Sequence, residues 1–229
     1  MSNVVKVRWL GHSAFHIQTP EASLLIDPFF AGNSRAPADC SQIQADFILV
    51  SHGHGDHIGD SVAIAKAQGS TIIANYEIAG WFEAKGIQAH GLQHGGGFHF
   101  PFGYLKLTLA FHGSALPDGA NGGNPCGFLI KFRAGKTFYD AADTGLFGDM
   151  KLIGDEGIDL AAVPIGDNFT MGPKDAVRAV EFLRPARVIP IHYGTFPLIE
   201  QDPHAWAQSV RSQTTSQALV LKPGDTLDL

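Results

Sequence analysis

Residues 51–57, with the sequence Ser-His-Gly-His-Gly-Asp-His, constrain the fold of this chain more than any other stretch. They follow an apolar run over 46–50 that is typical of a buried strand, and they precede a stretch over 58–68 that we expect to be helical. Three histidines and one aspartate therefore fall on one strand-to-helix turn. The two glycines let this turn bend so that the side chains converge. Imidazole and carboxylate groups suit zinc and similar divalent metals, so the sequence predicts a metal site here.

Three further candidate ligands follow predicted strands. His112 comes after an alternating strand, Asp143 follows the second strand of a hairpin, and His192 follows an apolar run. Functional residues at strand ends are a general expectation for α/β folds. Asp140 competes with Asp143, but the Asp-Thr-Gly context favours Asp143. Seven groups are too many for one tetrahedral ion and suit two ions that share a carboxylate and a hydroxide: His52, His54, Asp56, His57, His112, Asp143 and His192.

The chain as a whole has the composition of a globular protein. It has 229 residues, of which 45% are hydrophobic and 17% charged, and it contains 27 glycines. We expect one domain over 1–229. Strands dominate the first part, and helices and strands alternate in the second, which predicts the α/β class (α+β in some schemes). Cys40 and Cys126 form no CxxC pair and are expected to be free thiols.

Charge and hydropathy restrict the kinds of partner and the cellular compartment that we expect. The net charge of -6 and the absence of a basic patch argue against nucleic-acid binding. The longest apolar runs are well short of the roughly 20 residues that a membrane span needs. The first six residues lack the basic and apolar regions of a signal peptide. We therefore expect a cytoplasmic protein that acts on a small-molecule substrate without a membrane partner; a homo-oligomer remains open.

The ligand order HxHxDH, His112, Asp143 and His192 resembles that of the metallo-β-lactamase superfamily, and the match runs from Asp27 to His192. Within that superfamily, shorter motifs resemble the UPF0173-type metal-dependent hydrolases. These are relatives of ascorbate-6-phosphate lactonases and of N-acyl phosphatidylethanolamine phospholipase D. The motifs are WLGHSAF at 9–15, LIDPF at 25–29, GDNFTMG at 166–172 and PIHYGTFP at 190–197.

The resemblance implies a four-layer αββα sandwich with the site at one edge of two facing sheets. It implies that one metal is held by His52, His54 and His112 and the other by Asp56, His57 and His192, with Asp143 bridging them. It also implies that Asp27 supports the histidine loop. The expected activity is hydrolysis of an ester, lactone or phosphoester by a hydroxide between two divalent ions. Zinc is the expected metal, with manganese and iron as alternatives.

Several residues near the motifs have open roles. His12 either packs as an ordinary histidine or donates a proton to a leaving group, and we count it with Asp56 as a candidate catalytic residue. Asp27 and Asp60 are candidates to accept hydrogen bonds from ligand histidines. Asp167 and Asn168 either touch substrate or cap a helix. Three phenylalanines could wall a pocket: Phe29, Phe30 and Phe196. The remaining histidines are expected to be structural: His16, His90, His94, His99 and His204.

Three other functions compete with a binuclear hydrolase. Phosphodiesterases and nucleases of the same superfamily include large members with an extra domain, for which this chain has no room. Di-iron redox proteins of the superfamily carry Glu where this chain has His54. A metal-binding protein without catalysis would lack a ligand, and none is missing here.

Overall fold

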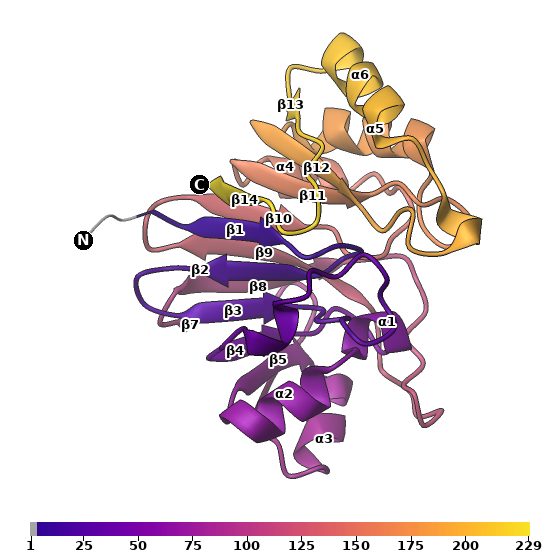
Figure 1. Cartoon of the computed structure of the whole chain (residues 1–229). Coiled ribbons are helices and arrows are strands. Elements are labelled where there is room, and N and C mark those ends of the chain that lie inside the picture. The colour runs from indigo at the N-terminus through magenta and orange to yellow at the C-terminus, as the bar shows by residue number, and fades with distance from the viewer. Residues whose placement is uncertain (1–3) are drawn as a thin grey trace.

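The structure, a computed structural model that describes residues 4–229, contains two seven-stranded sheets that face each other (Figure 1). The first three residues of the N-terminal segment considered above lie outside the described part. The first sheet has the order β14-β1-β2-β3-β4-β5-β6. Its strands are β1 (Lys6–Trp9), β2 (Phe15–Gln18), β3 (Ser23–Ile26), β4 (Phe47–Leu49), β5 (Thr71–Asn75), β6 (Ala89–Leu92) and β14 (Thr226–Asp228).

The second sheet has the order β13-β12-β11-β10-β9-β8-β7. In both sheets, one half is antiparallel and the other half is mostly parallel. The strands of the second sheet are β7 (Gly97–Phe100), β8 (Gly103–Leu109), β9 (Cys126–Phe132), β10 (Thr137–Asp140), β11 (Leu160–Pro164), β12 (Arg187–Ile191) and β13 (Gln217–Ala218).

Helices cover the outer face of each sheet (Figure 1). The first sheet carries α1 (Gly55–Ile58), α2 (Ser61–Gln68) and α3 (Tyr76–Glu83). The second sheet carries α4 (Met150–Gly154), α5 (Pro173–Leu183) and α6 (Pro203–Gln213). Two short 3₁₀ helices, η1 (Cys40–Gln42) and η2 (Pro197–Ile199), lie in loops. This confirms the predicted four-layer αββα architecture of the α/β class. Within residues 4–229, no helix combines the length and the hydrophobicity needed to cross a membrane.

Two apolar cores explain why the central strands read as continuous hydrophobic runs. On β3, Leu24 and Ile26 belong to the core between the sheets, while Leu25 belongs to the core under α2 and α3. Successive side chains of a strand point to opposite faces, so a sheet covered on both sides needs apolar residues at every position. Between the sheets, Phe15 of β2 packs edge-on against Phe138 of β10, with ring centroids 5.5 Å apart.

The first and last strands of the chain lie at one edge of the first sheet. β14 pairs with β1 in antiparallel register, with Lys6 opposite Asp228 and Arg8 opposite Thr226. The backbone N–H of Leu229 donates to the carbonyl oxygen of Val5 at 2.8 Å. This edge strand and β6 were not predicted, because neither Thr-Leu-Asp nor Ala-His-Gly-Leu has a strand-like pattern. The last strand of the second sheet, β13, is only two residues long and ends at Ala218.

The helix expected over 58–68 is two helices, α1 and α2, and Gly59 separates them. Gly59 has φ of 45° and ψ of -127°, a conformation that side chains disfavour. A Cβ atom at this position would also collide with the carbonyl oxygen of Pro28. The break lets α1 begin at Gly55, so that Asp56 and His57 lie in a helical turn rather than in a loop.

Replacing Gly59 with Ala should therefore lower the free energy of unfolding by about 1–3 kcal/mol, because the backbone is left-handed and the space is filled. Gly55→Ala is the matched control, since a Cβ there meets open space. It should leave stability unchanged or raise it slightly, as expected for Gly→Ala in a helix. Urea unfolding of both variants checks this. Equal stabilities would contradict the role assigned to Gly59.

Candidate metal centre

The predicted ligands come from both sheets and meet at one edge of the sandwich. His52 and His54 follow β4 of the first sheet, and Asp56 and His57 lie on α1 just after them. The other three follow strands of the second sheet: His112 after β8, Asp143 after β10 and His192 after β12. The sequence placed each of them at a strand end, and the two sheets bring these ends together.

His52, His54 and His112 form one donor set. The Nδ1 atom of His54 lies 3.1 Å from Nε2 of His52 and 3.2 Å from Nε2 of His112. One ring proton cannot serve both contacts, so three neutral imidazoles do not satisfy each other here. Nitrogens bound to a tetrahedral zinc at about 2.0–2.1 Å are separated by about 3.3–3.4 Å. The spacing therefore suits a shared cation.

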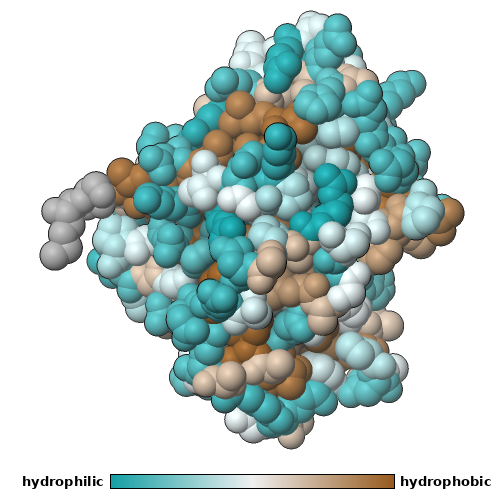
Figure 2. Space-filling view, in the orientation of Figure 1, coloured by the Kyte–Doolittle hydropathy of each residue, from teal (hydrophilic) through white to brown (hydrophobic). Residues whose placement is uncertain are grey.

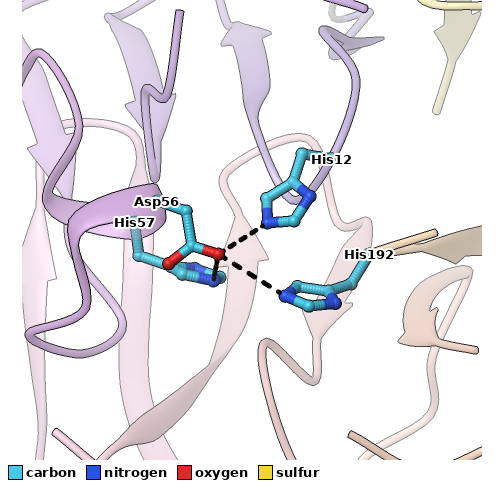
Figure 3. A group of neighbouring side chains, drawn as sticks. All are labelled: His12, Asp56, His57 and His192. Carbon is cyan, nitrogen blue, oxygen red and sulfur yellow. Dashed lines mark hydrogen bonds and ion pairs between the residues drawn. The ribbon is translucent and has the colours of Figure 1, made fainter. Parts of the chain in front are cut away.

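The second donor set is His12, Asp56, His57 and His192 (Figure 3). The Oδ2 atom of Asp56 lies 4.0 Å from Nε2 of His57, 3.9 Å from Nε2 of His192 and 3.1 Å from Nε2 of His12. His12 thus joins the three residues that the family resemblance implied for this metal. Its other ring nitrogen, Nδ1, lies 3.0 Å from Oγ1 of Thr195, a contact that no sequence pattern indicated.

Asp143 lies between the two donor sets. Its Oδ2 atom is 3.6 Å from Nε2 of His112, which belongs to the first set. The same oxygen is 3.3 Å from Nε2 of His57 and 2.9 Å from Nε2 of His192, which belong to the second. Asp140, the competing carboxylate, belongs to neither set and accepts a hydrogen bond from the N–H of Ala142.

Asp27 supports the histidine loop from below, as the resemblance implied. Its carboxylate is fully buried and lies 2.7 Å from Nδ1 of His57. It also accepts hydrogen bonds from the backbone N–H and the hydroxyl of Ser51 at 2.8 and 2.5 Å. The expectation for Asp60 was wrong. Because of the corner at Gly59, its carboxylate points to another loop and accepts from the N–H groups of Phe30 and Ala31.

Burial and neighbouring charges set the protonation of the ligands. Burial lowers the pKa of His52 and of His112, which favours the neutral imidazole that binds metals. Burial alone would lower the pKa of His57, but the carboxylates of Asp143 and Asp27 raise it well above the usual value. Burial likewise opposes ionisation of Asp143, yet His192 and His57 lower its pKa well below the usual range. The site therefore holds carboxylate and imidazole groups, both of which bind divalent cations, close together.

Three buried atoms of the ligand residues have no hydrogen-bond partner of good geometry. They are Nε2 of His57, Oδ1 of Asp143 and Nδ1 of His192. Buried polar atoms without partners are rare in folded proteins, and a metal ion is one of the recognised explanations. Together with the nitrogen- and oxygen-rich donor sets, these atoms show that the residues fit a divalent metal.

Left-handed backbone conformations also gather around the site. His12, Asp27, Ala142 and His192 have φ values of 53°, 41°, 51° and 53°. Residues other than glycine adopt such conformations at a cost of order 1–3 kcal/mol, and they cluster at functional sites. Here they turn the chain at the ends of strands, so that His12 and His192 point inward (Figure 3).

The remaining histidines have structural contacts, as expected. Nε2 of His94 lies 2.8 Å from the carbonyl oxygen of Pro125, and Nε2 of His16 lies 2.9 Å from Oγ of Ser23. His90 packs on Phe98 and His99 on Tyr104. His204 lies in the first turn of α6. Both cysteines are buried free thiols, which confirms that expectation.

Comparison with known proteins agrees with this geometry. The sequence profile of the "Beta-lactamase superfamily domain" matches residues 23–193. A UPF0173 metal-dependent hydrolase from Heliobacterium modesticaldum is 48% identical over 234 residues, covering 99% of this chain and 98% of the relative. The chain belongs to the UPF0173 metal-dependent hydrolases of the β-lactamase superfamily.

Other members of the UPF0173 group and of the fold extend this result. A UPF0173 metal-dependent hydrolase from Thermus thermophilus is 48% identical, covering 99% of this chain and 100% of the relative. The metallo hydrolase Igni18 from Ignicoccus hospitalis is 34% identical, with a TM-score of 0.90 over 99% of this chain and 98% of Igni18. The metallo-β-lactamase fold protein YhfI from Bacillus subtilis shares the fold, with a TM-score of 0.76 at 17% identity over 100% of both chains. This UPF0173 protein is thus a metal-dependent hydrolase, and its fold is that of the superfamily.

Replacing Asp27 with Asn should weaken metal binding by about 10–100-fold, because the buried carboxylate that orients His57 would lose its charge. Asp140→Asn is the matched control, since Asp140 is equally buried but contacts no donor atom of the two sets. Competition with a chromogenic chelator measures both affinities. If both variants lose affinity equally, the loss follows from changing any buried carboxyl group beside the site and not from the contact with His57.

Asp140 should also make stability depend on pH. Burial raises its pKa to about 8, above its value of about 3.9 in an unfolded chain. Between those values the folded state binds more protons than the unfolded state, so the stability contributed by protonated Asp140 is lost as pH rises towards 8. The loss has an upper bound of about 1.4 kcal/mol per pH unit.

Asn at this position cannot ionise. The free energy of unfolding of metal-free Asp140→Asn, minus that of the metal-free wild type, should therefore grow between pH 5 and pH 8. Urea unfolding at several pH values measures this difference. A constant difference would show that Asp140 does not change its protonation on folding.

Proposed function

We propose that this hydrolase uses two divalent ions, with zinc as the expected metal and manganese or iron as alternatives, to cleave an ester, lactone or phosphoester bond. The position of Asp143 carries this proposal. One oxygen of its carboxylate lies within 3.6 Å of nitrogens from both donor sets. A carboxylate so placed can be shared by two cations, and a single-ion site would have no use for two complete sets of donors.

The residues divide the work of holding the two ions. His52, His54 and His112 would hold the first, Asp56, His57 and His192 would hold the second, and Asp143 would contact both. Such a pair supplies Lewis acidity and lowers the pKa of water towards 7. The protein's own contribution is to keep His52 and His112 neutral by burial, to fix the orientation of His57 through Asp27, and to present one open side to the substrate.

His12 and Asp56 are the residues for which we predicted a catalytic role. His12 is fully buried and is absent from the residues that line the cavity at the site. Burial lowers the pKa of His12 to about 4, so its ring is neutral near pH 7. We propose that the neutral ring donates from Nε2 to Asp56 and thereby holds this carboxylate towards the second ion. In this role His12 positions a ligand and does not protonate a leaving group.

The number of bound ions tests the proposal. Protein expressed with sufficient metal should contain close to two ions per chain by elemental analysis, and His54→Ala should contain about one, because only the first donor set is broken. His94→Ala is the control, since His94 contacts a backbone carbonyl outside the site. Less than one ion per chain in the wild type would overturn the binuclear proposal.

Hydrolysis tests the same site independently. Asp56→Asn and His57→Ala should each lower kcat/KM for phenyl acetate by at least about 100-fold, since loss of a ligand should cost no less than loss of its supporting contacts. The circular dichroism spectrum should stay that of the wild type. Retention of activity in either variant would exclude it from the catalytic centre.

A further inference from the structure

The cavity beside the donor sets has a polar floor and aromatic walls. It encloses about 230 Å³ and is lined by His54, Asp56, His112, Asp143 and His192 together with Phe169 and Phe196. Ligand pockets for drug-sized molecules usually measure about 300–1,000 Å³, so this one suits a smaller substrate. Its polar groups belong to the metal centre already described. The two phenylalanines have no part in that centre and need another explanation.

Phe196 is held in place by the metal centre's own neighbours. Its ring meets His12 edge-on, with centroids 5.7 Å apart, and lies 6.3 Å from the ring of Phe29. Despite these contacts it is 36% exposed. It precedes η2, and hydrophobic residues project at the right-hand edge of the molecule where this segment lies (Figures 1 and 2). One ring face is therefore fixed and another remains open to the cavity.

Phe169 is presented by a tightly bonded loop between β11 and α5. Asp167 and Asn168, just before it, have left-handed φ values of 60° and 46°. The N–H of Thr170 donates to the carbonyl oxygen of Asp167 at 3.1 Å, and the N–H of Met171 donates to that of Thr144 at 2.9 Å. Phe169 is nevertheless 52% exposed. A strained, well-anchored loop that holds a large apolar side chain at the mouth of a reaction site indicates a ligand contact.

Among residues 4–229, no Lys or Arg side chain lines this cavity. Arg35 lies beside Tyr193, the residue after His192. Its guanidinium group stacks on the Tyr193 ring at 5.2 Å from the centroid and donates to the carbonyl oxygen of that residue. A substrate with a negative charge remote from the reacting bond would place that charge against Phe169 or Phe196 without a partner. A charge beside these apolar rings gives up part of its hydration and gains no ion pair, so such substrates are disfavoured.

Resting on the proposed hydrolytic function, we infer that the substrate is an uncharged carboxylic ester or lactone whose small apolar or aromatic group lies between Phe169 and Phe196. The two rings supply a contact surface for this group, and the reacting carbonyl lies towards the donor sets. Compounds with a phosphate or carboxylate away from the reacting bond are excluded by the same walls. Phe169 and Phe196 are thus specificity-determining residues.

A matched pair of esters tests this inference. Phenyl acetate and 4-acetoxybenzoate carry the same acetyl group on phenols of similar basicity, and they differ in a remote carboxylate. The wild-type holoenzyme should hydrolyse phenyl acetate with a kcat/KM about 10-fold or more above that for 4-acetoxybenzoate. Phe169→Ala and Phe196→Ala should each lower kcat/KM for phenyl acetate by about 2–10-fold, the range expected for loss of one aromatic pair. The decrease in kcat/KM for ethyl acetate should be smaller than that for phenyl acetate in both variants, because an ethyl group has less surface to contact the two rings.

A variant that introduces a positive charge tests the inference by a gain of activity and not only by a loss. Phe169→Arg should raise kcat/KM for 4-acetoxybenzoate and lower it for phenyl acetate, because the carboxylate gains a partner. Phe98→Ala is the matched control. The exposed fraction of Phe98, 48%, is similar to that of Phe169, but Phe98 lies on β7 and does not line the cavity. It should leave the ratio of the two esters unchanged. The metal content of every variant should equal that of the wild type.

The outcomes separate the inference from the function on which it rests. Equal kcat/KM values for the two esters, or no change of their ratio in Phe169→Arg, would overturn the inference and leave the hydrolytic function intact. If the metal-loaded wild type cleaves bis(4-nitrophenyl) phosphate but none of the three esters, the inference is overturned in favour of a phosphodiester substrate. Failure with all four compounds would overturn the proposed function itself.

Discussion

The buried carboxylate of Asp27 connects the first sheet to the chemistry at its edge. Both of its oxygens are used, one by the backbone N–H of Ser51 and the other by the Ser51 hydroxyl and by Nδ1 of His57. A charge in this environment is stable only when it is fully paired, so the side chain cannot move without breaking several contacts. The end of β3 thereby fixes the loop after β4, the start of α1 and the tautomer of one ligand. Every other distance in the site is set relative to these groups.

The second requirement is that two independent sheets place their strand ends in register. His52 and His57 come from the first sheet, and His112, Asp143 and His192 from the second. The backbone N–H of His192 donates to the carbonyl oxygen of His12 at 3.1 Å, which ties a loop of one sheet to a loop of the other. Aromatic side chains such as Phe15 and Phe138 set the separation of the sheets deeper in the core. Packing of the core and the geometry of the ligands are therefore parts of one arrangement.

The sequence predicted those features that depend on residue type and local pattern. Continuous apolar runs located the central strands, and the need for imidazole and carboxylate ligands identified all seven candidates. What could not be predicted depends on contacts between distant residues. The break at Gly59 arises from the approach of Pro28, and it turns Asp60 away from the ligands. β14 is a strand only because β1 offers an unpaired edge, and the exposure of Phe169 follows from a loop whose backbone conformation leaves no signature in composition.

The pairing of β1 with β14 has a consequence for engineering the protein. β1 runs from Lys6 towards His12, so the start of β1 and the end of β14 lie at the end of the sheet away from the histidines. Val5 and Leu229 are hydrogen-bonded there, so the described part of the chain begins and ends at neighbouring positions (Figure 1). A short linker could join them, and new termini could be opened in an exposed loop without moving a ligand. A fusion partner or a surface attached beside β1 and β14 would likewise leave the edge with the metal ligands open. The protein is therefore suited to immobilisation.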